Sequence, residues 1–279
     1  MDEKEHFDRL ISYYEKSRLG YDLALQGSKH FGFYPEGGKV TEKKAQSLLQ
    51  ELVAKKLRVS PKDVILDAGC GQGVVSTYLA QKYGCRIEGI TVVPFETNKA
   101  SLLAKKLGVA GSVSYSLMDY NKTRFHDCHF DGIYTTETLC HSVDIRKTLR
   151  EFYRILKKGG SIALFEYTLA EDAEFSGYEK EMIRRVAKGS AMDGLKDFRH
   201  NKFQGIIRDA GFNGVKAEDI SENIMPSLER LRNFLILPYY LFVKPFGLQE
   251  KFPNASAAVE FYKMAKKGLI HYVIFTATK

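Results

Sequence analysis

The chain has 279 residues, of which 44% are hydrophobic and 27% charged, with 23 glycines and 7 prolines. These values are typical of a folded globular protein and exclude disordered, collagen-like and membrane-bundle classes. The 42 basic residues outnumber the 34 acidic ones, which gives a net charge of +8. This charge favours an anionic ligand or surface, but it is scattered along the chain, so no nucleic-acid partner is expected.

Predicted helices and strands alternate along most of the chain. Apolar residues at three- and four-residue spacing predict an amphipathic helix over 41–57, and the run VILDAG then predicts a strand that ends in glycines. The later predicted elements are helix 74–82, strand 86–92, helix 97–107, strands 112–117 and 130–135, helix 145–156, strand 161–167, helix 203–209, and strands near 215–220 and 271–278. We expect Gly159-Gly160 to end the helix before strand 161–167. This order favours an α/β fold with a mostly parallel sheet, whose ligands bind outside the carboxyl ends of the strands.

Three segments stand outside this alternation. Residues 1–40 are rich in aromatic side chains, about 170–200 is charged and helical, and 222–265 begins with a strongly apolar run. We expect an N-terminal aromatic helical cover over 1–40 and a core over 41–279 that carries the other two segments as helical cover insertions. The alternative is that these helices only pack on the sheet.

A glycine loop follows the first predicted strand. DAGCGQG places Asp67 at the strand end and glycines at 69, 71 and 73, where the backbone can turn tightly and approach a ligand. A dinucleotide fingerprint would need its third glycine at Val74, so NAD is disfavoured. The loop predicts a nucleotide-like ligand, and the alternative is a tight strand-to-helix turn.

Five segments together resemble one enzyme family. VILDAGCGQG resembles the first motif of class I S-adenosylmethionine-dependent methyltransferases, and LKKGGSIALFE resembles their late helix–glycine–strand signature. KHFGFY, GITVVPFE and YTTETLCHSVD resemble the branch with sterol C-methyltransferases, tocopherol methyltransferases and cyclopropane fatty acid synthases. The resemblance implies a Rossmann-like, seven-stranded, mostly parallel sheet flanked by helices, and S-adenosylmethionine as cofactor of a methyltransferase.

The resemblance also implies a set of cofactor-binding residues. Thr91 stands where most class I methyltransferases have the acidic residue that holds the ribose hydroxyls, a departure shared with the named branch. Glu96 can instead accept hydrogen bonds from both ribose hydroxyls. The alternative is that Glu96 is only a carboxylate in the first turn of a helix, where the helix dipole favours it. Asp119 matches the acidic residue that contacts the adenine amino group, or it forms a turn. The other implied residues are Asp67, Gly69, Cys70, Gly71, Gly73, Tyr120 and Thr136; Cys70 is expected to be a small filler.

The acceptor side is predicted from the chemistry of methyl transfer. An acceptor must be held in line with the methyl and shielded from water. An alkene acceptor also needs aromatic faces or carboxylates beside its cation, and a base that removes a proton. Glu137 and His141 are the candidate base and its partner, and they share one face if this segment is helical; otherwise they are a polar pair at a helix start. Tyr34 and His30 complete the candidate catalytic set, although a histidine among aromatic residues can simply be packed.

Aromatic residues of the N-terminal segment are expected to cover the acceptor. They are Tyr13, Tyr14, Tyr21, Phe31, Phe33 and Tyr34. No metal site is expected, because HDCH at 126–129 lacks the second ligand pair of a structural zinc site. A prenyl diphosphate acceptor would use the basic charge and could require magnesium. The basic candidates for that role are Arg184, Arg185 and Lys188, unless they only form a solvated helix face.

The apolar segment 224–246 indicates the acceptor class. It is expected to form a wall of an apolar pocket, which favours carbon methylation of a sterol, prenyl or other isoprenoid, or else to bury a dimer contact. The alternatives are nitrogen or oxygen methylation of a lipophilic alkaloid, quinone or polyketide, and a non-catalytic cofactor-binding protein. The expected partners are an apolar small molecule and a peripheral membrane contact, in a monomer or homodimer.

Two features predict a cytosolic protein. The first residues, MDEKEHF, are charged where a signal peptide needs an apolar run, and none of the four cysteines lies in a C-x-x-C pair. The most apolar stretch, 234–243, is interrupted by Pro238 and is too short to cross a bilayer.

Overall fold

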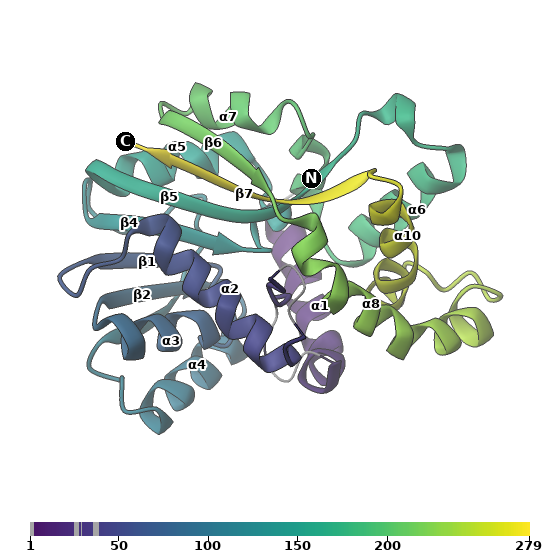
Figure 1. The fold of residues 1–279 in the computed structure, drawn as a ribbon, viewed down its shortest axis with the longest axis horizontal. Helices are drawn as coiled ribbons and strands as arrows, with labels where there is room; N and C mark the ends of the chain where they lie inside the picture. The colour runs from purple at the N-terminus through teal and green to yellow at the C-terminus, as the bar shows by residue number, and fades with distance from the viewer. Residues whose placement is uncertain (1–2, 25–27, 29, 36–38) are drawn as a thin grey trace.

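The computed structural model describes residues 3–24, 28, 30–35 and 39–279, with the backbone alone over 18–24. Lys29 of the KHFGFY segment and the side chain of Tyr21 lie outside the described atoms. In the described part of the chain, seven strands form one sheet in the order β3-β2-β1-β4-β5-β7-β6 (Figure 1). Their bounds are β1 Val64–Ala68, β2 Arg86–Thr91, β3 Val113–Leu117, β4 Phe130–Thr136, β5 Leu156–Leu169, β6 Asn213–Asp219 and β7 Ile270–Thr278.

The sheet confirms the mostly parallel fold expected from the sequence. Strands β1 to β5 pair in parallel, and β7 runs antiparallel between β5 and β6. The structure differs from the prediction at Gly159 and Gly160, which were expected to end the preceding helix. That helix already ends at Ile155, and both glycines lie inside β5. Gly159 adopts a φ of 78° and its N–H donates to the carboxyl-terminal Lys279 oxygen at 3.0 Å, so these glycines bend a strand end.

Helices cover both faces of the sheet and bury two separate apolar clusters. Alternate residues of β5 point to opposite faces: Ala163 and Phe165 join the cluster under α2 and α3, whereas Ile162 and Leu164 join the cluster under α5 and α7. The bounds of these helices and of α4 are α2 Glu42–Leu57, α3 Val74–Tyr83, α4 Pro94–Lys106, α5 Ile145–Ile155 and α7 Phe203–Asp209.

Local chemistry explains where the flanking helices begin. The Thr41 hydroxyl accepts the Lys44 N–H at the start of α2, and the Asp144 carboxylate accepts the Lys147 N–H at 3.0 Å at the start of α5. These helices therefore start within one residue of the predicted positions.

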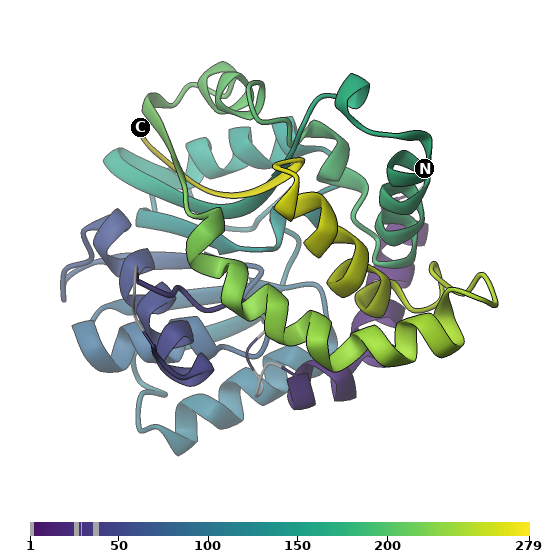
Figure 2. The same ribbon diagram turned by 45° about the vertical axis from the view of Figure 1, so that its right-hand side comes forward.

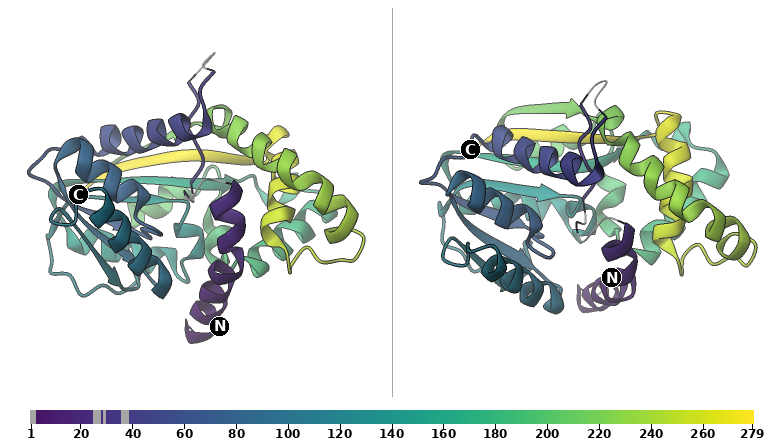
Figure 3. Two further views of the ribbon diagram at one scale, coloured as in Figure 1. Left: turned by 90° about the horizontal axis from the view of Figure 1, so that it is seen from below. Right: turned by 60° about the horizontal axis from the view of Figure 1, so that its bottom comes forward.

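A second group of helices lies at the end of the sheet toward which β1 to β5 run (Figures 1 and 3). Their bounds are α1 Glu3–Ala24, α6 Gly177–Gly189, α8 Ser221–Pro238, the π-helix η4 Tyr239–Val243, α9 Pro253–Ser256, the π-helix η5 Ala257–Phe261 and α10 Tyr262–Lys266, with short 3-10 turns η1 Leu139–His141, η2 Asp172–Glu174 and η3 Asp193–Asp197. No described helix is long and apolar enough to cross a membrane.

Pro238 does not interrupt the helical path as the sequence suggested. It is the last residue of α8, and the chain continues directly into the π-helix η4. A proline cannot donate the usual helical hydrogen bond and its ring crowds the preceding turn. The wider π turn accommodates this loss without reversing the chain.

Candidate active site

A cavity of about 1360 Å³ opens at the carboxyl edge of β1, β2 and β4. Its walls come from the segments that follow β1, β2, β3 and β4, and from α1, α8, η5 and the loop before α9. Pockets for one small molecule usually occupy about 300–1,000 Å³. The cavity is therefore large enough for two ligands side by side.

The glycine loop forms one wall of the cavity. The N–H groups of Gly69 and Cys70 both donate to the Ile90 oxygen at 2.9 Å, which fastens the loop to β2. Gly69 has a φ of 86°, and a Cβ there would lie 2.2 Å from the Thr138 hydroxyl oxygen. Gly71 has a φ of 50° and also lines the cavity. A ligand can therefore approach the backbone of this loop with no side chain between them.

Two residues of the predicted cofactor set do not line the cavity. Asp67 is buried behind the loop, and this burial raises the pKa of its carboxyl to about 7. A Cβ on Gly73 would meet the Tyr115 hydroxyl oxygen at 2.6 Å, so this glycine allows α3 to start close to β3. The predicted direct contact with the cofactor is corrected for both residues: they support the loop from behind.

The predicted ribose side of the site is built around a buried carboxylate. The Thr91 hydroxyl donates to Glu96 Oε2 at 2.7 Å, and the same hydroxyl oxygen accepts the Val93 N–H. Glu96 lies in the first turn of α4 and lines the cavity with Thr91. Thr91 thus orients the carboxylate rather than replacing it.

Asp119 and Tyr120 line the cavity next to this carboxylate, and Thr136 lines it at the end of β4. Asp119 accepts hydrogen bonds from the backbone and the side-chain amide of Asn121, both at 2.8 Å, and its burial raises the pKa of the carboxyl. The Tyr120 hydroxyl donates to the Thr138 oxygen at 2.9 Å. Asp119 therefore both shapes a turn and faces the cavity.

Glu137 lies in a strained turn after β4, with a φ of 57° that non-glycine residues rarely adopt. Its carboxylate accepts hydrogen bonds from the Phe31 N–H at 3.0 Å, the Tyr272 hydroxyl at 3.1 Å and the Tyr167 hydroxyl. Burial nevertheless raises its pKa to about 7. A carboxyl poised between its neutral and charged forms at the wall of a cavity is suited to proton transfer.

The two tyrosines that hold Glu137 were not predicted from the sequence. Tyr167 and Tyr272 are opposite each other in the antiparallel β5–β7 pair, and their ring centroids lie 5.3 Å apart. The sequence feature that could have revealed Tyr272 is the predicted final strand. If that strand runs antiparallel, its first residues lie at the edge of the sheet where the parallel strands end.

His141 does not share a helical face with Glu137. The segment after Glu137 is the 3-10 turn η1, and the two side chains have different partners. The Tyr14 hydroxyl donates to His141 Nε2 at 2.9 Å, and Nδ1 lies 3.1 Å from the Ala191 oxygen, to which it donates. His141 therefore links α1 to the segment before η3.

His30 lines the cavity, but both its ring nitrogens are engaged. Nδ1 donates to the Phe31 oxygen at 2.8 Å, and Nε2 accepts the Gln50 amide at 3.2 Å. Burial lowers the pKa of the ring, so His30 is a neutral, packed histidine.

Tyr34 lies outside the cavity, which corrects its place in the predicted catalytic set. Its hydroxyl donates to Glu42 Oε2 at 2.9 Å, and its N–H donates to the Asn223 oxygen at 2.8 Å. Burial together with the Glu42 carboxylate raises the pKa of Tyr34 to about 12. Tyr34 therefore ties segment 30–35 to α2 and α8.

Helix α1 closes one side of the cavity through polar contacts. His6 is buried, with Nδ1 at 2.5 Å from Asp193 Oδ2 and Nε2 at 2.9 Å from the His141 oxygen. Arg9 also binds Asp193, at 2.7 Å, and the Tyr13 hydroxyl donates to Asn254 at 2.5 Å. These contacts attach α1 to η3, η1 and α9 across the site.

The wall opposite the glycine loop is apolar. Helices α8 and α10 and the π-helix η5 contribute aliphatic and aromatic side chains: Ile224, Met225, Leu228, Leu231, Phe261 and Ala265. The prediction that segment 224–246 lines an apolar pocket therefore matches the position of its first half.

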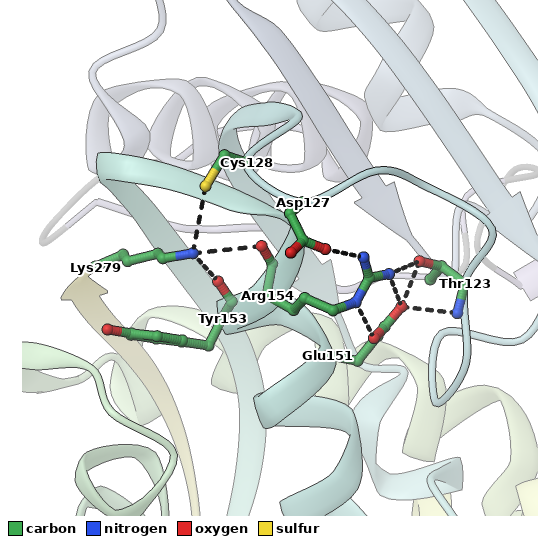
Figure 4. A network of polar contacts seen from close by, with 7 residues as sticks. All are labelled: Thr123, Asp127, Cys128, Glu151, Tyr153, Arg154 and Lys279. Carbon is green, nitrogen blue, oxygen red and sulfur yellow. Dashed lines mark hydrogen bonds and ion pairs between the residues drawn. The ribbon is translucent and has the colours of Figure 1, made fainter.

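The HDCH segment belongs to a polar network that also contains residues of α5 and Lys279 (Figure 4). Arg154 binds Asp127 at 2.6 Å and also Glu151, and Lys279 donates to the Tyr153 oxygen at 2.6 Å. Among the described residues, no group of three or more potential ligands is arranged to hold a metal.

The basic residues considered for a diphosphate are neutralised. Arg184 and Arg185 both bind Glu181, at 2.8 and 2.6 Å, and Lys188 binds Glu250 at 2.7 Å. Of the three, only Lys188 lines the cavity.

Comparison with known proteins identifies the family. Residues 66–164 match a family model described as a methyltransferase domain. The chain is 30% identical over 260 residues to the S-adenosyl-L-methionine-dependent Diels-Alderase iccD of Talaromyces variabilis, a match that covers 90% of this chain and 88% of the relative. It is 29% identical over 220 residues to a sterol 24-C-methyltransferase of Eremothecium gossypii, with 77% of this chain covered but only 57% of that protein.

The fold agrees with these matches. The structure of the cyclopropane synthase MmaA2 from Mycobacterium tuberculosis aligns with a TM-score of 0.83 at 15% identity, covering 98% of each chain. The chain thus spans little more than half of the sterol methyltransferases it matches, but nearly all of the Diels-Alderase and the cyclopropane synthase. The chain belongs to the class I S-adenosylmethionine-dependent methyltransferases, in the branch that includes sterol C-methyltransferases and cyclopropane synthases, and S-adenosylmethionine is its cofactor.

Proposed function

We propose that this chain transfers a methyl group from S-adenosylmethionine to a carbon atom of an apolar, isoprenoid-type acceptor. The observation that carries this proposal is one cavity with two unlike walls, polar at the glycine loop and apolar at α8, and with the Glu137 carboxyl on its surface. Such a cavity can hold a charged nucleotide-like cofactor and an apolar acceptor in contact.

The residues present fit the cofactor. We assign its ribose hydroxyls to Glu96, which Thr91 orients, and its adenine amino group to Asp119. Gly69 and Gly71 permit close approach to the loop, where a Cβ at Gly69 would collide with Thr138. When bound, S-adenosylmethionine supplies an activated methyl on a positively charged sulfur.

Glu137 is assigned to the acceptor. With a pKa of about 7 it can accept a proton near neutral pH, and in its charged form it stabilises a neighbouring cation. Tyr167 and Tyr272 hold the carboxylate in place from β5 and β7. His141 is assigned a positioning role, because it connects Tyr14 of α1 to Ala191.

The three basic residues considered for a diphosphate are already paired, which favours a neutral acceptor. Arg184 and Arg185 bind Glu181 outside the cavity, and Lys188 at the wall binds Glu250. Binding a diphosphate with these three residues would require breaking such pairs or a magnesium ion. A sterol, a polyene or another uncharged isoprenoid-type molecule needs neither.

The helical segments complete the proposal as covers of the site. We propose that α1, α6 and the helices from α8 to α10 exclude water during transfer, since α1 is fastened across the cavity by His6 and Arg9. We also propose a cytosolic location and a peripheral membrane contact; the described cysteines are all free thiols.

A second candidate is cyclisation of a polyene without methyl transfer. The observation that favours it is that the relative matched over 88% of its length is called a Diels-Alderase. The same apolar wall would fold a polyene, and the bound cofactor would remain unconsumed.

Isotope transfer separates the two functions. The protein is incubated with S-adenosylmethionine labelled in its methyl group and with sterols, prenyl alcohols and linear polyenes, and products are followed by mass spectrometry. Label on a new carbon–carbon bond supports the first function. An isomer of the substrate without label supports the second, and label on nitrogen or oxygen only would overturn both.

Glu137 provides a second readout. Glu137→Gln is expected to lower methyl transfer by about a hundredfold but to leave calorimetric binding of S-adenosylhomocysteine unchanged. If the wild-type protein is folded and binds no S-adenosylhomocysteine, the assignment of the cavity to this cofactor is wrong.

A further inference from the structure

The exposed apolar side chains of the described structure gather on one segment. We call residues 234–246 the apolar ridge; they comprise the end of α8, η4 and the turn after it. Six of the eleven large hydrophobic residues that are exposed in the described structure belong to it: Phe234, Leu237, Tyr240, Leu241, Phe242 and Phe246. Figures 2 and 3 show this segment projecting from the end of the molecule. Apolar groups clustered in this way usually mark an interaction surface.

The inner side of the ridge is firmly packed. Tyr239 and Val243 are buried with Val259 of η5, and the Tyr239 hydroxyl donates to Glu260 at 2.9 Å. Leu241 and Phe242, between these two anchors, are 53% and 62% exposed. The outer apolar face is therefore held outward by a buried inner face.

The ridge itself carries one basic side chain, Lys244, and no acidic one. Residues 233–249 contain no Asp or Glu. The Lys244 amine lies 5.2 Å from the Tyr240 ring centroid and 5.5 Å from that of Tyr178, and no described carboxylate pairs with it. Exposed aromatic and aliphatic residues beside an unneutralised lysine are typical of the water–lipid interface.

The ridge is continuous with the mouth of the cavity. Phe234 is 61% exposed and also lines the cavity, as do Leu235 and Phe252. An apolar molecule that leaves a lipid surface at the ridge would enter the cavity along these side chains. A second copy of the chain packed on the ridge would instead cover this mouth.

We propose that the apolar ridge inserts into an anionic phospholipid surface, from which the apolar acceptor enters the cavity. The proposal rests on the proposed function for the identity of the acceptor. A lipid surface fits better than a protein partner because the ridge carries a lysine and no acidic side chain, and because Phe234 and Leu235 connect it to the apolar cavity that an acceptor from the lipid would enter.

A single tryptophan can report insertion, because the chain contains none. Phe242→Trp places the fluorophore on the ridge, and Leu102→Trp places it on α4, where the native side chain is 65% exposed but lies outside the ridge. With mixed phosphatidylcholine–phosphatidylserine vesicles, we expect a blue shift and stronger emission for Phe242→Trp and no change for Leu102→Trp. Equal responses, or none at Phe242→Trp, would overturn the proposal.

Charge insertion provides the matched loss-of-binding test. The double variant Leu241→Glu/Phe242→Glu is expected to weaken flotation with these vesicles by at least tenfold, since each apolar side chain contributes roughly tenfold to partitioning. Leu102→Glu, the control, is expected to bind as the wild type does. Leu241 and Phe242 do not line the cavity, so S-adenosylhomocysteine binding should be unchanged in the wild type and both variants.

The outcomes separate this proposal from the proposed function. Vesicle binding that is lost only in the ridge variant supports the ridge even if no acceptor is methylated. A wild-type protein that binds S-adenosylhomocysteine but never floats with vesicles overturns the ridge alone. Concentration-dependent dimers that dissociate in the ridge variant, without vesicle binding, would assign the ridge to a second copy.

Discussion

The two walls of the cavity differ in how the chain builds them. The cofactor wall comes from short segments that directly follow β1, β2 and β3, and each of its residues is near a strand end in the sequence. The acceptor wall brings together α1, the turn after β4, α8 and the start of β7, which are far apart along the chain. The first wall depends on backbone shape at a few positions, whereas the second depends on packing between distant helices. Substitutions in the cofactor wall should therefore act through local backbone strain. Substitutions in the acceptor wall should act through the loss of a reacting group or through a shift of the covering helices.

The largest expected effect is at the cofactor wall. Gly69→Ala forces a residue with a Cβ into a φ of 86° and within 2.2 Å of the Thr138 hydroxyl. Left-handed strain of about 1–2 kcal/mol adds to overpacking of about 1–3 kcal/mol. We expect S-adenosylhomocysteine binding, measured by calorimetry, to fall at least a hundredfold.

Gly108→Ala is the matched control for this strain. Gly108 has a φ of 72°, but a Cβ there would meet nothing within 4 Å. We expect a loss of about 1 kcal/mol in stability and unchanged ligand binding. If both variants bind the ligand equally well, close backbone approach at Gly69 is not needed.

At the acceptor wall, Glu137→Gln is expected to lower turnover by about a hundredfold, a typical contribution of a positioned base. The folded protein raises the pKa of Glu137 to about 7, so the wild-type carboxyl is neutral below this pH and charged above it. Turnover that needs the charged form should rise through about pH 7 and then level off. The remaining activity of the variant should lack this rise, and an unchanged pH profile would exclude the carboxyl as the base.

Glu166 is a second buried carboxyl, on β5 and outside the cavity lining. Its Oε1 accepts the Thr135 hydroxyl at 2.9 Å and the Leu139 N–H at 3.1 Å, and burial raises its pKa to about 8. Because this pKa is higher in the folded than in the unfolded chain, folding takes up a proton between about pH 4.5 and 8. The stability due to neutral Glu166 is complete below this window and is lost as pH rises through it.

Glu166→Gln is therefore expected to be more stable than the wild type near pH 8, by an amount on the order of a few kcal/mol. Near pH 4.5 the two proteins should unfold at similar urea concentrations. A stability difference independent of pH would show that Glu166 is charged in the folded protein.

The sequence predicted the first wall better than the second for a physical reason. Periodicity and glycine spacing are local signals, and they placed the loop at Gly69 and the carboxylate at Glu96 correctly on the cavity wall. Even there, Asp67 was misplaced, since its position behind the loop depends on the path of the turn and not on the motif.

The second wall depends on contacts that no local pattern contains. Tyr167 meets Tyr272 only because the last strand inserts antiparallel beside β5. Likewise, Glu137 and His141 diverge because the chain after β4 forms a strained turn and a 3-10 turn instead of an α-helix. Helical spacing predicts a shared face only where the chain is helical.

The smallest expected effect concerns a residue that was expected at the second wall. Tyr34→Phe removes the hydroxyl that donates to Glu42 outside the cavity, so we expect a loss of about 1 kcal/mol in stability and unchanged turnover. Tyr14→Phe removes a similar hydroxyl, but this one lines the cavity and donates to His141. We therefore expect the KM of the Tyr14→Phe enzyme for the acceptor to rise, while its S-adenosylhomocysteine binding is unchanged. Urea unfolding and steady-state kinetics of the two variants measure both effects. The reverse pattern, with turnover lost in Tyr34→Phe and kept in Tyr14→Phe, would mean that segment 30–35 turns its tyrosine into the cavity when the acceptor binds.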